Sequence, residues 1–252
     1  MTPGLLLAFT GISEGYGPKP VTFVTHALGD AAVWLLIATL SVSPLRAITR
    51  WNALIHTRRI FGNFALAYAL THVAVYVWSE GPLKAASEIV LRVYLTIGFA
   101  ALATLVMLGV TSNDVAVKRL GAEGWKRVHR WIYVASALGL LHYFLQSKND
   151  VTPALLQAGF FILLMLWRLL DRFKRGASTL WLVGLAVGAG LATAGLEVAW
   201  YFWRSGLPPL DVLSANLDVD FEIRPPWIVA GAGLAAAALS LFRRRTGTAR
   251  RP

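Results

Sequence analysis

The sequence contains no cysteine among its 252 residues. This absence excludes disulfides, thiolate catalysis, iron–sulfur clusters and covalently attached c-type haem, and it leaves histidine as the residue suited to metal ligation. Charged residues are also scarce, at 15% against about 25% in soluble domains. With 56% hydrophobic residues and a mean hydropathy of +0.58, the composition predicts an integral membrane protein.

The chain also lacks the motifs of several catalytic and binding classes. It has no GxGxxG segment in a strand–helix context, no nucleophile elbow and no metalloprotease motif, so neither a nicotinamide-binding domain nor a bond-making active site is expected. The net charge is +11, but the basic residues form short clusters between apolar runs without a base-reading motif. Nucleic acid is therefore not an expected partner. A cleavable signal peptide is not expected either, because no basic n-region or cleavage site is visible.

Apolar runs predict the membrane topology. Seven of them are candidates for crossing a bilayer as helices, and these lie at residues 24–44, 60–78, 93–110, 131–145, 154–170, 180–203 and 227–242. Another run, at residues 3–12, is too short to span and is interpreted as the end of a truncated first helix. Basic loops alternate with neutral or acidic ones, so the positive-inside rule places the basic loops and the C-terminus in the cytoplasm. The predicted fold is an all-α, polytopic helical bundle with about seven full spans.

Two histidines lie at matching depths inside predicted spans. His72 lies thirteen residues beyond Arg59, and His142 lies twelve residues beyond Arg130. At about 1.5 Å per residue, both side chains lie roughly 18–20 Å above the cytoplasmic boundary. Imidazoles from two helices at one level are what a bis-histidine haem b requires. A histidine in a span can instead hydrogen-bond to a neighbouring helix, but the matched pair favours haem.

The other three histidines have less clear roles. His129 precedes His142 by thirteen residues, a spacing that leaves the two side chains about 140° apart on an ideal helix. Ligation of a second haem by His129 therefore requires an irregular helix start, and the alternative is a solvated histidine at the interface. His56 could be its partner if the basic loop folds upward; otherwise a second haem is five-coordinate or absent. His26 is expected at the outer interface or near a haem propionate.

Arginines surround His129 on the predicted cytoplasmic side. They are Arg46, Arg58, Arg59, Arg127 and Arg130. Topology determination is a sufficient explanation for them. Their guanidinium groups would also suit an anion site for haem propionates or for the phosphate of a flavin.

Several segments together resemble the MsrQ family, within the ferric-reductase-like transmembrane group. The segments are SPLR (43–46), TRRIFG (57–62), ALTH (69–72), LGAEGWKRVHRWIY (120–133) and LHY (141–143), and the resemblance covers roughly residues 20–175. It implies one or two b-type haems with His72, His142 and His129 as axial ligands. It also implies electron entry from a cytoplasmic flavin reductase, with FMN, or from a membrane quinol. Electrons would then pass to a periplasmic molybdopterin methionine sulfoxide reductase, across the inner membrane of a bacterium.

Three features depart from the family pattern. The first helix is truncated, and Asp30 stands where an arginine is expected after the early His–x–x–Gly, which weakens any anion site there. Residues 180–242 add two spans beyond the usual end. We therefore expect two parts, a ferric-reductase-like haem-binding domain at residues 1–175 and a C-terminal extension with two transmembrane helices at residues 176–252.

The predicted function is an electron conduit that repairs oxidised periplasmic proteins through a partner enzyme. One alternative is a stand-alone haem b ferric or quinone reductase that acts without a periplasmic partner. Another is a transporter or structural membrane protein whose histidines are proton relays or packing residues. Transporters have broken helices and charges at mid-depth, and Glu197, near the outer end of the 180–203 run, gives that alternative weak support.

Overall fold

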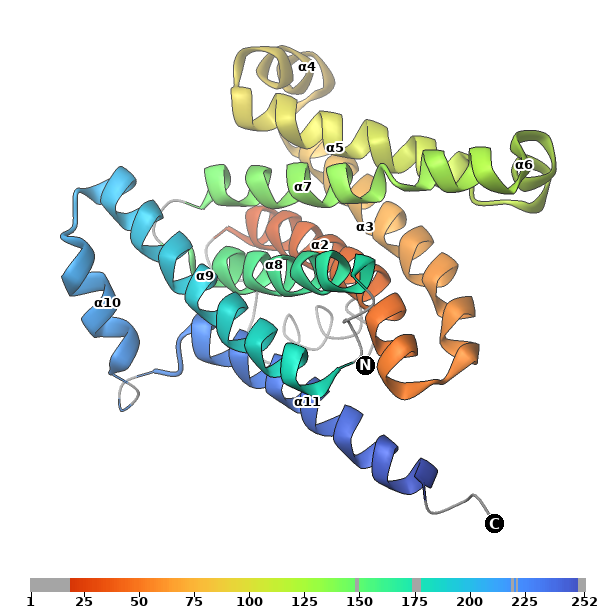
Figure 1. Cartoon of the computed structure of the whole chain (residues 1–252). Helices are drawn as coiled ribbons and strands as arrows, with labels where there is room; N and C mark the ends of the chain where they lie inside the picture. The colour runs from red at the N-terminus through yellow and green to blue at the C-terminus, as the bar shows by residue number, and fades with distance from the viewer. Residues whose placement is uncertain (1–18, 148–149, 174–177, 219, 221, 249–252) are drawn as a thin grey trace. The chain divides into compact units, whose positions relative to one another are not determined.

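The computed structural model describes residues 19–147, 150–173, 178–218, 220 and 222–248, with side chains as far as residue 241 (Figure 1). All regular secondary structure in these ranges is helical, which confirms the predicted all-α class. The elements are α2 (Pro20–Thr49), η1 (Asn52–His56), α3 (Thr57–Glu80), α4 (Pro82–Leu91), α5 (Val93–Val110), α6 (Asp114–His129), α7 (Ile132–Gln146), α8 (Thr152–Arg172), α9 (Thr179–Ser205), α10 (Pro209–Leu217) and α11 (Pro225–Thr248). The helix end predicted at residues 3–12 lies outside the described residues.

Five helical segments are long and apolar enough to cross a membrane. They are α2, the continuous segment Asn52–Glu80, α5, α8 and α9. The other two predicted runs are helical as well, but α7 has only 15 residues, and the apolar part of α11, Pro225–Leu241, is also short for a span. The chain is thus a multi-pass membrane protein, whereas the predicted number of seven spans is not confirmed.

Short helices occupy segments that we predicted as loops. They are η1, α4, α6 and α10. Their start signals are present in the sequence, since Pro82 and Pro209 stand in the first turns of α4 and α10. Asn113 caps α6 by accepting a hydrogen bond from the Ala116 amide at 2.8 Å. A search for runs of membrane length misses such helices because they are short or polar.

Helix α2 continues past Pro44, where the sequence analysis ended the span. The structure contradicts that end point, since α2 runs on to Thr49. Proline has no amide hydrogen, so it cannot donate the usual helical hydrogen bond to the carbonyl of Leu40. Arg168 of α8 donates to that carbonyl instead, from Nη2 at 2.7 Å. An arginine inside a span thus satisfies the backbone group that the proline leaves open.

The described chain forms two packing units, and each is described by itself. The first contains the chain up to Thr39 together with Arg58–Gln146. Within it α5 lies along α7, α4 packs on α5, and the end of α5 contacts α6 (Figure 1). The three histidines that the sequence singles out as ligands, His72, His129 and His142, all lie in this unit.

The second unit contains Leu40–Thr57 and the chain from Ser147 onward. Here α8, α9 and α11 pack on one another, and α10 packs on α9. The helices approach closely at small residues, because a Cβ atom on Gly233 would lie 2.6 Å from that of Ala186. The core includes Ile48, Trp167, Leu182, Leu185 and Ala237. The predicted boundary at residue 175 separates a haem-binding domain from a C-terminal extension. It is a different division from these packing units, and it stays a prediction.

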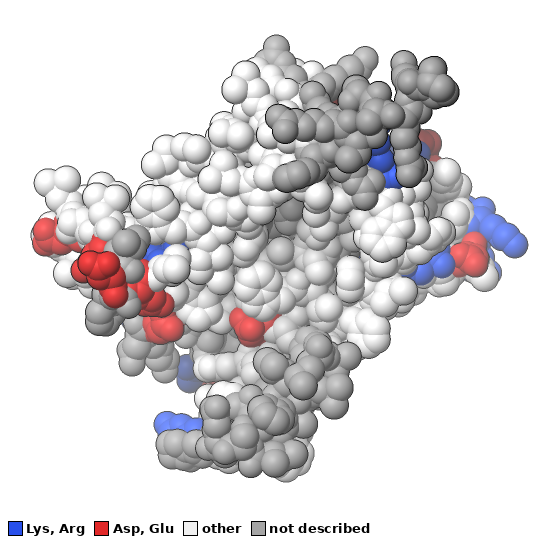
Figure 2. Space-filling model, turned by 90° about the horizontal axis from the view of Figure 1, so that it is seen from below, with Lys and Arg blue, Asp and Glu red and all other residues white. Residues whose placement is uncertain are grey.

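The surface is rich in exposed apolar side chains. Leu83, Val90 and Leu91 of α4 are each at least 80% exposed, and Trp78 at the end of α3 is 77% exposed. On the face shown in Figure 2 the charged side chains gather in a few patches, and the rest of the described surface there is uncharged. Such a surface suits contact with lipid, in which exposed apolar groups are favourable.

Candidate functional site

His72 lies on α3 and its ring rests against α2. Its Nδ1 donates a hydrogen bond to the backbone carbonyl of Thr25 at 2.7 Å. The ring covers Gly29, where an added Cβ atom would lie 3.1 Å from Nδ1 and 3.2 Å from Cε1. The imidazole is thus hydrogen-bonded to one carbonyl, and it packs against the glycine one helical turn later, where no side chain blocks it.

His142 lies on α7 and is held by α5 in the same way. Its Nδ1 donates to the backbone carbonyl of Tyr94 at 2.8 Å. The ring covers Gly98, where an added Cβ atom would lie 2.8 Å from Nδ1 and 3.0 Å from Cε1 and Cγ. The aromatic ring of Tyr94 also stacks on His142, with centroids 6.3 Å apart and planes at 28°.

The two cradles share one sequence pattern, a carbonyl at position i and a glycine at position i+4. In an α-helix the Cα–Cβ bond tilts toward the N-terminus, so the side chain at i+4 covers the turn that carries the carbonyl of residue i. A glycine at i+4 removes that cover. The carbonyl oxygen has two lone pairs, so it can accept from an imidazole in addition to the helical amide. Glycine at i+4 therefore leaves the carbonyl of residue i open to a hydrogen bond from a histidine on a neighbouring helix.

The cradles bring the two imidazoles together, as the counted depths predict. The ring centroids of His72 and His142 lie 6.3 Å apart, with planes at 80°. An iron–imidazole bond is about 2 Å long and the ring centre lies roughly 1 Å further, so rings on opposite sides of one iron have centres about 6 Å apart. A carbonyl can only accept, so Nδ1 of each ring carries the hydrogen and Nε2 keeps the lone pair that binds metal. These two residues fit the axial positions of a haem.

A bare metal ion fits this part of the protein less well. Within the described residues there is no group of three or more His, Cys, Asp or Glu side chains that could hold a metal ion. Protein sites for Zn²⁺ and similar ions supply at least three such ligands. A haem brings four ligands of its own and needs only the axial pair.

His129 is engaged in a different arrangement at the end of α6. Its ring stacks on Trp125, with centroids 3.7 Å apart and planes at 20°. Nδ1 lies 3.2 Å from the carbonyl of Trp125, and Nε2 lies 3.2 Å from Oγ of Ser112. Ligation of iron by His129 stays a prediction, and it requires the ring to leave Ser112. The irregular helix start that ligation by His129 would require is present, because α6 ends at His129 and α7 begins at Ile132.

The two remaining histidines are both exposed. His56 lies in η1, within the second packing unit, so its pairing with His129 stays a prediction. His26 lies on α2 beside Thr25, and it interacts electrostatically with both His72 and His142. Its expected place at the outer interface or near a haem propionate stays a prediction.

Basic residues adjoin His129, as the sequence predicts for Arg58 and Arg59. Arg127 and Arg130 are its neighbours along the chain. Arg46 belongs to the second packing unit, so its place beside His129 stays a prediction. Burial lowers the pKa of His129, and the charges of Arg58 and Arg59 lower it further. Its imidazole is therefore neutral at pH 7. Arg59 also forms an exposed ion pair with Asp114 at 3.1 Å. The anion site predicted at this basic cluster stays a prediction. The exposed ion pair adds little stability.

Three charged residues lie inside the long helices and contact a polar partner there. The sequence analysis names only Glu197 as a charge within a span. Glu197 is 1% exposed and accepts a hydrogen bond from Arg224 at 3.0 Å. Asp30 of α2 was expected only as a departure from the family pattern, and its carboxylate accepts from the hydroxyl of Tyr143 at 3.2 Å. The sequence analysis overlooked Arg168. Each of these charges has a partner within its own unit, which gives it a role in packing or in the histidine site without invoking transport.

Comparison with known proteins covers most of the first packing unit. Residues 28–140 match the family model described as ferric reductase like transmembrane component, a range that includes His72 and His129 and ends two residues before His142. No solved structure matches the chain.

Named relatives match a longer part of the chain. The protein-methionine-sulfoxide reductase heme-binding subunit MsrQ of Herminiimonas arsenicoxydans is 38% identical over 56% of this chain and 66% of its own length, just under two thirds. MsrQ of Ralstonia nicotianae is 35% identical over 66% of this chain and 78% of its own length. The magnetosome protein MamZ of Magnetospirillum gryphiswaldense is 37% identical over 66% of this chain but only 27% of its own length. On the MsrQ matches, this chain belongs to the MsrQ family of ferric-reductase-like transmembrane proteins.

Proposed function

We propose that this protein binds a haem b between His72 and His142 and carries electrons through the membrane. The observation that supports this most directly is the pair of imidazoles with centroids 6.3 Å apart, each with Nδ1 hydrogen-bonded to a backbone carbonyl. The printed names of its MsrQ relatives, heme-binding subunits of a methionine sulfoxide reductase, support the same cofactor. A second haem at His129 would follow if its contact with Ser112 opened.

The haem, when bound, supplies a reversible one-electron couple. The residues of this chain hold it and set its potential. The hydrogen bond from each Nδ1 to a carbonyl fixes the orientation of the ring and raises the basicity of Nε2, which favours the oxidised iron. The glycines at positions 29 and 98 let both rings reach those carbonyls. Both imidazoles are partly buried, and burial is a further determinant of potential.

We propose that the donor is a cytoplasmic flavin reductase or a membrane quinol, and that the acceptor is a periplasmic, molybdopterin-containing methionine sulfoxide reductase. In this scheme the partner makes and breaks the bonds, and this chain is an electron-transfer subunit in a bacterial inner membrane with its C-terminus in the cytoplasm. The basic cluster around His129 would bind the phosphate of FMN or the haem propionates, because guanidinium groups suit both. Electron transfer would then repair oxidised periplasmic proteins.

The first experiment is a reduced-minus-oxidised absorbance spectrum with haem quantification on the purified protein. We expect a b-type spectrum in wild type, and its loss in His72→Ala and in His142→Ala. His56→Ala should keep the spectrum of the His72–His142 haem, because His56 is an exposed histidine in the other packing unit. His129→Ala distinguishes one haem from two. A colourless wild type from cells with ample haem, or full haem in His72→Ala, would refute the proposal.

A second experiment tests the direction of electron flow. The reduced protein in vesicles is mixed with the periplasmic reductase and a protein that contains methionine sulfoxide. We expect rapid reoxidation only when both are present, since the sulfoxide is the final acceptor. Reoxidation that needs neither component would favour the stand-alone reductase alternative.

A further inference from the structure

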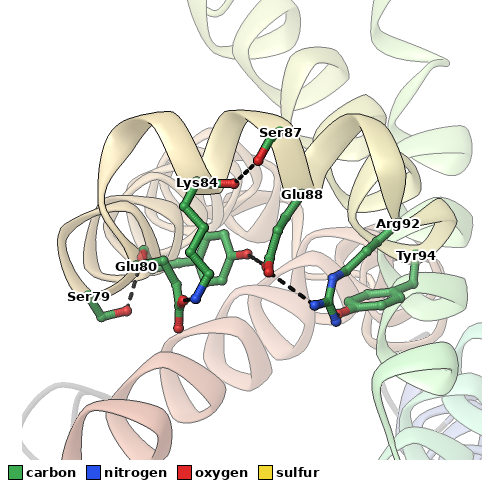
Figure 3. A network of polar contacts seen from close by, with 8 residues as sticks. Ser79, Glu80, Lys84, Ser87, Glu88, Arg92 and Tyr94 are labelled. Carbon is green, nitrogen blue, oxygen red and sulfur yellow. Dashed lines mark hydrogen bonds and ion pairs between the residues drawn. The ribbon is translucent and has the colours of Figure 1, made fainter.

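A polar network joins α3, α4 and α5 at one end of the first unit (Figure 3). The hydroxyl of Tyr76 on α3 donates to Oε2 of Glu88 on α4 at 2.7 Å. Arg92, which follows α4, donates from Nη2 to Oε1 of Glu88 at 3.0 Å. Its Nη1 also donates to the hydroxyl of Tyr94, the second residue of α5, at 3.3 Å. The two oxygens of one carboxylate thus connect three helices.

Each end of this network adjoins one histidine of the pair. Tyr76 lies one turn after His72 on the same helix, so both side chains project from one side of α3. Tyr94 contacts His142 twice, because its carbonyl accepts the Nδ1 hydrogen bond and its ring stacks on the imidazole. Glu88 itself touches neither histidine. It lies between the residues that adjoin them.

We propose, on the basis of the proposed haem site, that Glu88 is a positioning residue that sets the orientation of His72 relative to His142. It does so by fixing α3, through Tyr76, against the start of α5, through Arg92 and Tyr94. The angle between the two imidazole planes, 80° in the structure, depends on that arrangement. Glu88 acts through its neighbours Tyr76 and Arg92.

The local chemistry agrees with this role. The hydrogen bond from Tyr76 and the nearby charges of Arg92 and Lys84 hold the pKa of Glu88 below its usual range, so the carboxylate is ionised at neutral pH and accepts at both oxygens. A sharp turn at Gly81, with φ of 83°, brings α4 back over the end of α3. The Arg92–Glu88 pair is half exposed on the arginine side, so its contribution to overall stability is small. Its main effect is geometric.

The same corner contains a natural control. Lys84 of α4 forms an ion pair with Glu80, the last residue of α3. Among the described residues this pair shares no hydrogen bond with the network, and it acts on Tyr76 and Glu88 only through its charges. Lys84→Gln therefore removes a salt bridge between the same two helices and leaves the Tyr76–Glu88–Arg92–Tyr94 chain in place. A general loosening of the corner would affect Lys84→Gln and Glu88→Gln alike.

The test compares Glu88→Gln and Tyr76→Phe with Lys84→Gln in the purified haem protein. The largest g value of an oxidised bis-imidazole haem in electron paramagnetic resonance depends on the angle between the imidazole planes. We expect a shifted g value and a shifted midpoint potential in Glu88→Gln and in Tyr76→Phe, with haem content retained. The double variant should shift no further than either single one, because both remove the same connection. Lys84→Gln should match wild type.

A second measurement does not need haem. The chain has no cysteine, so spin labels can be placed directly at Leu70→Cys on α3 and Phe99→Cys on α5, two exposed positions. We expect the label-to-label distance distribution to broaden in Glu88→Gln and to stay narrow in Lys84→Gln. If wild type holds haem but Glu88→Gln leaves both readouts unchanged, or if Lys84→Gln reproduces its effects, the inference is wrong. A haem-free wild type whose distances still respond to Glu88→Gln would refute the proposed function alone.

Discussion

Replacing Gly98 with alanine places a methyl group against the ring of His142. The added carbon would lie 2.8 Å from Nδ1 and 3.0 Å from two ring carbons, whereas ordinary contact begins near 3.4 Å. The ring must therefore retreat by roughly half an ångström, which stretches its 2.8 Å hydrogen bond to the Tyr94 carbonyl to the limit of such bonds, about 3.2 Å. Gly98→Ala should thus weaken the hold on one axial ligand.

The size of the effect follows from two opposing terms. Overpacking costs about 1–3 kcal/mol, and alanine in place of glycine within a helix returns up to about 1 kcal/mol. The net loss is up to about 2 kcal/mol, which weakens haem binding by as much as about thirty-fold. Gly29→Ala should have a smaller effect, because its added carbon would lie 3.1 Å from Nδ1 of His72.

The assay is the rate of haem transfer from the purified protein to an excess of apomyoglobin. Matched controls are Gly139→Ala on α7 and Gly62→Ala on α3, since among the described residues nothing lies within 4 Å of a Cβ atom at either position. We expect the rate to rise most in Gly98→Ala, less in Gly29→Ala, and not at all in the controls. Equal rates in Gly98→Ala and Gly139→Ala would refute the cradle argument.

Three further predictions concern the charges inside the helices. Asp30→Asn should raise the midpoint potential of the haem without loss of haem, because it removes a negative charge near the histidine pair; a redox titration that shows an unchanged or lower potential contradicts this. Arg224→Gln should lower the thermal unfolding temperature more than Glu197→Gln, since it leaves a carboxylate with 2% side-chain exposure uncompensated, a loss of about 3–5 kcal/mol; the reverse order would show that the arginine is the more deeply buried partner. Arg168→Met should destabilise by about 1–3 kcal/mol through the unpaired Leu40 carbonyl, and Pro44→Ala in the same chain should recover part of that loss; no recovery in thermal unfolding would mean that Arg168 stabilises by another contact.

Much of the fold can be predicted from the sequence, because membrane helices are recognised by their length and hydropathy. Each of the seven predicted runs is helical, and the pairing of His72 with His142 follows from residue counts along two helices. The predicted end at Pro44 was wrong. Proline usually ends a helix, and nothing near Pro44 in the sequence reveals that Arg168, more than a hundred residues later, donates a hydrogen bond to the Leu40 carbonyl. Short helices such as α4 were missed because they are below membrane length.

The surroundings of the histidines could not be predicted in the same way. Thr25 with Gly29 and Tyr94 with Gly98 share a spacing of four, but that pattern is common and gives no hint of which helix lies opposite. The position of Glu88 depends on the turn at Gly81, which folds α4 back over α3. The spacing of His129 and His142 showed only that joint ligation would require a break in the helix, and it contained no information on the stack with Trp125.

Both imidazoles are oriented by main-chain oxygens, and this has a consequence for sequence variation. Any residue at position 25 has a carbonyl, so the side chain there is free to change without loss of the hydrogen bond to His72. The glycine one turn later has no such freedom, although it contributes no polar atom. Among relatives that keep this site, substitution should therefore be tolerated at position 25, which supplies only a main-chain oxygen, and restricted at the two glycines, which only leave room for the rings.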